Sequence, residues 1–132
     1  MQGFPKQARL LRSVEFRKVY DQGRRRSLDF LVAFALENGQ PHSRIGLTVP
    51  RAVGNAVERN RVKRRLRESI RKRLADLGPG WDIVLNVRQM AKAVDFAVLD
   101  ETVAKYFYSC AQAIDRSPGK RRPEDSRPRA AS

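Results

Sequence analysis

Residues 44–87 indicate the fold class most clearly and read RIGLTVPRAVGNAVERNRVKRRLRESIRKRLADLGPGWDIVLNV. Apolar residues alternate with other residues in 44–49 and again in 81–87, and this spacing predicts a strand in each segment. A helix is predicted between them, because Asn55 and Glu58 have the spacing of a capping box and Gly78-Pro79-Gly80 is a helix stop. A strand, a helix and a strand in that order form a βαβ unit, which implies at least one parallel pair of strands.

The predicted helix, from Asn55 to about Asp76, is strongly basic on one side. Its apolar stripe steps by four residues: Val62, Leu66, Ile70 and Leu74. Residues 58–73 contain nine Lys or Arg and only two Glu, and helical geometry places most of these cations, Lys72 included, opposite the stripe. A merely solvated face would carry mixed charges in i, i+4 pairs. The excess of Arg over Lys therefore favours a polyanion with phosphate groups as the ligand.

The flanking segments complete a single α/β domain over residues 1–115. A strand is predicted over 28–37, forming a hairpin with the strand at 44–49 across the turn 38–41. A short helix is predicted over 14–20 with Ser13 as its N-cap, followed by a basic loop at 24–27, and a last helix over about 96–114. The first dozen residues are predicted to be a flexible arm, and 116–132 a disordered basic tail.

The composition limits the function classes. The 132 residues include 28 Lys or Arg and 14 Asp or Glu, so the net charge is +14, which calls for a polyanionic partner. The longest uncharged apolar run, residues 30–36, is far shorter than a membrane span. One cysteine and one histidine exclude an internal disulfide and argue against a metal site. We therefore expect a soluble, cytoplasmic, polyanion-binding domain, with nucleic acid as the first candidate ligand and an anionic membrane surface as the second.

Residues 51–68, RAVGNAVERNRVKRRLRE, resemble the Arg-Asn-Arg signature of the bacterial ribonuclease P protein component. The resemblance covers roughly residues 8–114. It implies an α/β (α+β) two-layer sandwich, with a small mixed sheet, three main helices and a left-handed βαβ crossover. Physical reasoning alone would predict the opposite hand, since about 98% of such crossovers are right-handed. Ala52 and Asn55 depart from the family pattern, in which Lys is common at both positions, and Arg51 replaces a frequent Lys.

The resemblance implies that the chain is a subunit of ribonuclease P, an endoribonuclease that removes the 5′ leader of precursor tRNA. Its partners would be the catalytic RNA and that leader, with neither a membrane nor a further protein required. The RNA subunit would catalyse cleavage with Mg²⁺, so the protein would hold no catalytic residue and no metal site. Its role would be to lower the Mg²⁺ demand and to broaden substrate use.

The resemblance also assigns residues to two contacts. Contact with the RNA subunit falls to Arg51, Asn55, Arg59, Asn60, Arg61, Lys63, Arg64, Arg65, Arg67 and Arg71. Contact with the leader falls to Arg12, Phe16, Arg17, Tyr20 and Phe34, whose aromatic rings would stack on unpaired bases. From the residues alone, the three aromatics read more simply as core. A ribosomal-type structural RNA-binding protein and a DNA-coating architectural protein remain the alternatives.

Overall fold

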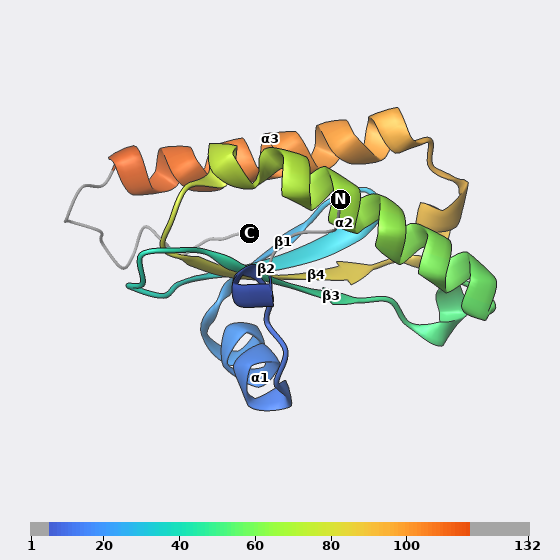
Figure 1. Ribbon diagram of the computed structural model, residues 1–132, viewed down its shortest axis with the longest axis horizontal. Helices are drawn as coiled ribbons and strands as arrows, with labels where there is room; N and C mark the ends of the chain where they lie inside the picture. Colours follow the sequence, from blue (N-terminus) through green and yellow to red (C-terminus); the bar gives the residue numbers. More distant parts are fainter. Residues whose placement is uncertain (1–5, 117–132) are drawn as a thin grey trace.

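The computed structural model describes residues 6–116, which form a four-stranded sheet with helices on both faces (Figure 1). In chain order the elements are η1 (Lys6–Ala8), α1 (Ser13–Gln22), β1 (Arg24–Ser27), β2 (Leu31–Glu37), β3 (Arg44–Thr48), η2 (Arg51–Val53), α2 (Ala56–Leu77), β4 (Trp81–Val87), η3 (Gln89–Ala93) and α3 (Phe96–Arg116). The helices α2 and α3 cover one face, and α1 lies on the other. The predicted α/β sandwich with three main helices is confirmed, and α1 adds a short third layer.

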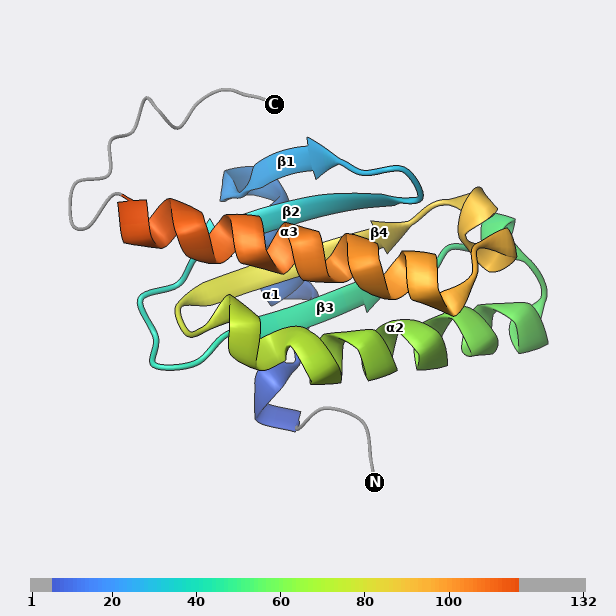
Figure 2. The same ribbon diagram turned by 90° about the horizontal axis from the view of Figure 1, so that it is seen from above.

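The strand order is β1-β2-β4-β3, in which only β3 and β4 are parallel. The predicted hairpin between the strands at 28–37 and 44–49 is therefore wrong, because β4 lies between them. β4 takes this central position because its apolar residues face both layers, and six of its seven residues are buried. Seen from the helix side along the direction of β3, β4 lies to the left (Figure 2), so the β3–α2–β4 crossover is left-handed.

The segment before β2 differs from the prediction in three places. Residues 24–27 are the edge strand β1, not a loop, and an edge strand accommodates exposed arginines. The N-cap of α1 is Arg12 rather than Ser13, and the Oε1 of Glu15 accepts hydrogen bonds from the backbone N–H groups of Leu11 and Arg12. The predicted flexible arm is ordered from residue 6, because Leu10 is buried and its N–H donates to the Ile45 carbonyl at 3.0 Å.

The core between the sheet and the α2–α3 layer follows the predicted stripes. Val62, Leu66 and Ile70 of α2 are at most 2% exposed. The Asn55 cap is confirmed: its Oδ1 accepts from the Glu58 N–H, and its own N–H donates to Glu58 Oε1, both at 2.9 Å. The predicted tail, 116–132, lies outside the described residues apart from Arg116, which ends α3. Within residues 6–116, no helix combines the length and apolar character needed to cross a membrane.

Candidate nucleic-acid interface

The position of α1 on the sheet is fixed by an ion-paired arginine. Arg44 of β3 donates from Nε and Nη2 to the two carboxylate oxygens of Asp82 on β4, at 3.0 and 2.7 Å. Its Nη1 donates to Glu15 Oε2 on α1 at 3.1 Å. The hydrogen bond from the Arg12 N–H lowers the pKa of Glu15, and the Arg44 charge acts in the same direction. One guanidinium thus ties the start of α1 to two strands.

The sheet face beneath α1 carries three rows of side chains that run across the strands. Since directly paired residues point to the same face, the register defines each row. The rows are Arg44–Asp82–Leu36, then Gly46–Val84–Phe34–Arg25, then Thr48–Asn86–Val32–Ser27. We call the third row the open strip, because none of its four residues is buried.

Three aromatic side chains, Phe16, Tyr20 and Phe34, lie together where α1 meets the second row; we call them the aromatic cluster. All three are partly buried and pack against buried apolar residues between α1 and the sheet. The rings of Tyr20 and Phe34 meet edge to face, with centroids 5.0 Å apart. The ring of Phe16 lies over Gly46, where an added Cβ would be 2.5 Å from its Cζ atom. The cluster is therefore both part of the core and part of the surface.

The hydroxyl of Tyr20 reaches from the aromatic cluster to the open strip. It donates to Asn86 Oδ1 at 2.7 Å and lies 3.4 Å from Thr48 Oγ1. The strip therefore begins directly beside the aromatic rings, with polar groups on its floor. The remaining residues assigned to the leader, Arg12 and Arg17, are exposed on α1. The structure thus brings apolar ring surface, hydrogen-bonding groups and cations together on one side of the sheet.

The cations of α2 fall into two groups, and the first is held by the rest of the protein. Arg73 Nη2 and Lys72 Nζ lie 2.7 and 3.4 Å from Asp100 Oδ2 on α3, and Ser69 also donates to this carboxylate. Hydrogen bonding from Arg73 is the main reason that the pKa of Asp100 is lowered to about 2. Lys72 therefore does not belong to the outward group in which helical geometry placed it. Arg65 is also engaged, since its Nη1 donates to the Val94 carbonyl at 3.4 Å.

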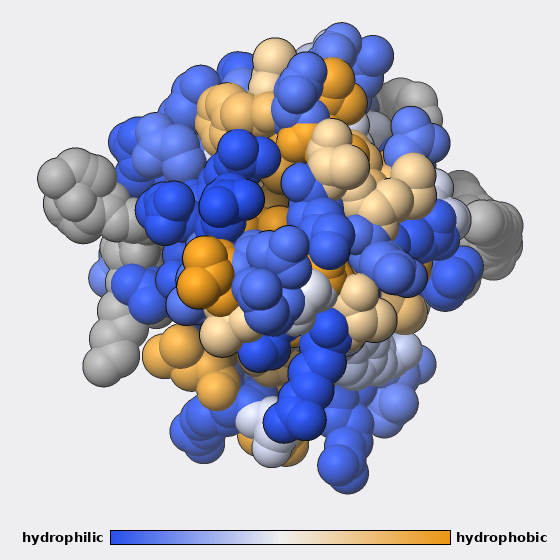
Figure 3. All heavy atoms as spheres, turned by 90° about the vertical axis from the view of Figure 1, so that its right-hand side faces the viewer, coloured by the Kyte–Doolittle hydropathy of each residue, from blue (hydrophilic) through white to orange (hydrophobic). Residues whose placement is uncertain are grey.

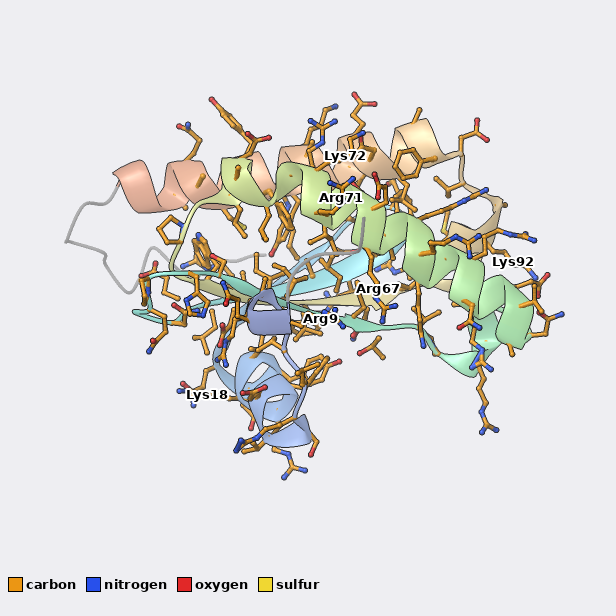
Figure 4. The ribbon with its side chains drawn as sticks, viewed as in Figure 1. Arg9, Lys18, Arg67, Arg71, Lys72 and Lys92 are labelled. Atoms are coloured by element: carbon orange, nitrogen blue, oxygen red, sulfur yellow. The ribbon has the colours of Figure 1, made fainter. Side chains whose placement is uncertain are left out.

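The second group is Lys63, Arg64 and Arg67, and we call these three residues together with the neighbouring Asn60 the basic face. Within residues 6–116, none of these four side chains makes a hydrogen bond or an ion pair. In Figure 4, Arg67 lies on the side of α2 that faces β3 and α1, with Arg9 between these two helices in that view. The basic face is thus left available for an external anion.

The other residues assigned to the RNA subunit surround the basic face. Arg51 and Arg61 are exposed, Arg59 is half-buried, and the exposed Asn55 uses its Oδ1 for the helix cap. Arg71 is exposed and pairs with Glu68 one turn earlier on the same helix. Figure 3 looks at the end of the molecule where α2 begins, and hydrophilic side chains spread over much of it with apolar patches between them.

Sequence reasoning missed several residues of these surfaces. The alternation in 81–87 places Asn86 on the face opposite Ile83 and Leu85, but only the strand order brings it to the Tyr20 hydroxyl. Asp100 gave no sequence signal, because its basic partners are 27 and 28 residues away in the chain. Arg25 lies in the segment predicted to be a loop, whereas β1 places it in the same row as Phe34.

The comparisons with known proteins all indicate the same family. The ribonuclease P family model matches residues 4–111. The ribonuclease P protein component of Methylococcus capsulatus is 42% identical over 106 residues, which are 80% of this chain and 82% of that protein. The Clostridioides difficile protein of that name is 36% identical over 95 residues, 71% of this chain and 83% of that protein.

Solved structures agree with this result. The ribonuclease P protein from Thermotoga maritima superposes with a TM-score of 0.70 at 28% identity, covering 76% of this chain and 96% of that one. A mutant ribonuclease P protein from Staphylococcus aureus, with defective mRNA degradation activity, superposes with a TM-score of 0.72 at 26% identity over 81% and 90%. With its signature on α2 and its left-handed crossover, this chain belongs to the family of bacterial ribonuclease P protein components.

Proposed function

We propose that this chain, as the protein subunit of the tRNA-processing ribonucleoprotein, uses two surfaces for two RNAs. The basic face of α2 and the assigned residues around it bind the RNA subunit. The aromatic cluster and the open strip hold the 5′ leader of precursor tRNA. One observation carries the proposal: cations without carboxylate partners in residues 6–116 lie on α2, while partly exposed aromatic rings lie under α1.

The physical role of the chain in this proposal is electrostatic. Two RNAs repel each other, and a +14 protein that touches both offsets the repulsion that Mg²⁺ must otherwise screen. About six phosphate contacts would give a slope of log K against log salt of roughly −4 to −5. Catalysis and the Mg²⁺ ions belong to the RNA subunit. Residues 6–116 contain no group of three or more His, Cys, Asp or Glu that could hold a metal ion.

The two-surface assignment is tested with one variant on each surface. Phe16→Ala should weaken binding of precursor tRNA with a leader by about 5- to 160-fold, since stacking contributes ~1–3 kcal/mol per base, and should leave leaderless tRNA unaffected. Arg64→Ala should weaken binding of the RNA subunit. Lys105→Ala on α3 makes the same change in net charge at a highly exposed position and is the control. If Phe16→Ala and Arg64→Ala gave the same defect, the assignment would be wrong.

The electrostatic role is tested by cleavage with the RNA subunit alone and with the protein, across a series of Mg²⁺ concentrations. The protein should shift half-maximal cleavage to lower Mg²⁺, and an unchanged midpoint would contradict the proposal. We place the chain in the cytoplasm. Sequencing the RNA that copurifies with it tests the identity of its RNA partner. One defined structured RNA supports the proposal, whereas ribosomal RNA would favour a ribosomal-type structural role. Reconstitution from RNA and this chain alone tests that no other protein is required.

A further inference from the structure

The edge strand β1 presents its three arginines to two different faces of the sheet. Arg26 points to the helix layer: its Nη1 donates to Ser109 Oγ at 3.0 Å, and its guanidinium lies 5.8 Å from the Tyr106 ring centroid. Arg24 lies on the same face, where burial raises the pKa of Cys110 and the charge of Arg24 acts in the opposite direction. Since side chains alternate along a strand, Arg25 points to the opposite face, the one that carries α1.

Arg25 ends the second row of that face. The row runs Gly46–Val84–Phe34–Arg25, and α1 covers its first three members. Arg25 is exposed at the uncovered end, and within residues 6–116 its side chain makes no hydrogen bond or ion pair. This guanidinium is therefore available beside the aromatic cluster, on the side away from α2.

The open strip leads to the same place. Its last member, Ser27, accepts a hydrogen bond from Arg88 Nη2 at 2.6 Å, and Arg88 Nη1 donates to the Leu28 carbonyl at 3.1 Å. These bonds fix the turn that follows β1. The strip therefore begins at β3, on the side of the basic face, and ends between Arg25 and Arg88 at the opposite edge of the sheet.

We infer that Arg25 binds the phosphate backbone of the distal part of the leader, where single-stranded RNA leaves the sheet at β1. The inference rests on the proposed function. The distal part of the leader lies at the β1 edge because the basic face, which binds the catalytic RNA in the proposed function, lies toward the β3 edge. The leader then crosses three strand spacings of about 4.8 Å, or about 14 Å, which is about four nucleotides at a stacked rise of ~3.4 Å.

A simpler explanation is that the arginines of β1 prevent other strands from pairing with this edge. That explanation treats Arg24 and Arg25 alike, because each is an exposed cation on the same short strand. The inferred contact separates them, since only Arg25 lies on the face of the aromatic cluster. Arg24→Ala is therefore a matched control for Arg25→Ala, with the same strand, residue type and charge change.

The experiment measures binding of precursor tRNA by the holoenzyme with leaders of zero, two and ten nucleotides. Arg25→Ala should weaken the ten-nucleotide substrate about three- to tenfold, the size of one exposed charge-assisted contact. It should also reduce the magnitude of the salt slope by about 0.7, the value for one single-strand phosphate contact. Arg24→Ala should change none of the three affinities, and urea unfolding should show equal stability for both variants.

Two kinds of failure are distinguishable. Suppose that Phe16→Ala weakens binding of the substrate with the ten-nucleotide leader but not of leaderless tRNA, while Arg25→Ala behaves like Arg24→Ala. The proposed function then stands, and the inferred contact is overturned. If Phe16→Ala does not distinguish the leader substrates from leaderless tRNA, the proposed function fails. An equal loss for all leader lengths with Arg25→Ala would show a nonspecific charge effect and would also overturn the inference.

Discussion

Replacing Asp100 with asparagine removes the negative charge at the junction of α2 and α3. The Asp100 side chain is only 11% exposed and accepts hydrogen bonds from Ser69, Lys72 and Arg73. Asparagine has nearly the same shape, so Asp100→Asn tests the charge rather than the packing. The variant keeps the basic face of α2 unchanged, because none of its four residues contacts Asp100.

The magnitude follows from the lowered pKa of Asp100. Its value of about 2, against an ordinary 3.8, corresponds to about 2 kcal/mol of stability at ~1.4 kcal/mol for each unit. Because the pKa is depressed in the folded protein, this stability is fully present well above pH 3.8. It is lost as the pH falls through about 2. Asp100→Asn should therefore lower the free energy of unfolding by about 2 kcal/mol at pH 7 and by about half as much at pH 3.

Urea unfolding of the wild-type chain and the variant at pH 7, 4 and 3 measures this difference. Glu101→Gln is the control, because the adjacent Glu101 pairs with Lys105 through side chains that are 64% and 77% exposed. Such a pair contributes less than about 0.5 kcal/mol. A loss below about 0.5 kcal/mol for Asp100→Asn at pH 7, or an equal loss at pH 7 and pH 3, would refute the reasoning.

Three further predictions concern α1, Gly46 and the start of α2. Arg44→Met should lower the free energy of unfolding by about 3 kcal/mol, because it leaves the nearly buried Asp82 carboxylate without its cation; urea unfolding measures this loss, and a change under 1 kcal/mol would contradict it. Gly46→Ala should displace the Phe16 ring, which costs about 1–3 kcal/mol and weakens leader-dependent tRNA binding; unchanged discrimination between leader and leaderless substrates would count against this arrangement. Asn55→Ala should cost about 1 kcal/mol through loss of the cap in the same unfolding assay, whereas an effect no larger than that of Ala52→Gly would show that the cap is unimportant.

The elements built on local pattern could be predicted from the sequence. The capping box at Asn55, the stripe Val62–Leu66–Ile70 and the strand 81–87 are each encoded within one or two helical turns or one strand. The Arg-Asn-Arg signature is a continuous stretch of sequence, residues 51–68, so the family could also be recognised from the sequence.

Apart from the N-cap of α1, which is decided by the nearby Glu15, the failures involve partners outside the segment itself. Nothing near residues 24–27 indicates a strand, because β1 is stabilised by pairing with β2 and none of its side chains is buried. The prediction of a hairpin between β2 and β3 failed because two strands joined by a short turn need not pair with each other. Burial of β4 on both faces favours its position between them.

Charge pattern, hydrophobic periodicity and the signature at residues 51–68 were enough to establish that this protein carries a basic helix on an α/β scaffold and belongs among the ribonuclease P protein components. The tertiary structure sets which cations of α2 have a carboxylate partner: Asp100 holds Lys72 and Arg73, whereas Lys63, Arg64 and Arg67 have no such partner within residues 6–116. It also decided that Arg25, Phe34 and Tyr20 share one face. The reason is that net charge and hydrophobic periodicity are properties of one segment. The ion-pair partner of a charged side chain depends on which segments the fold brings together.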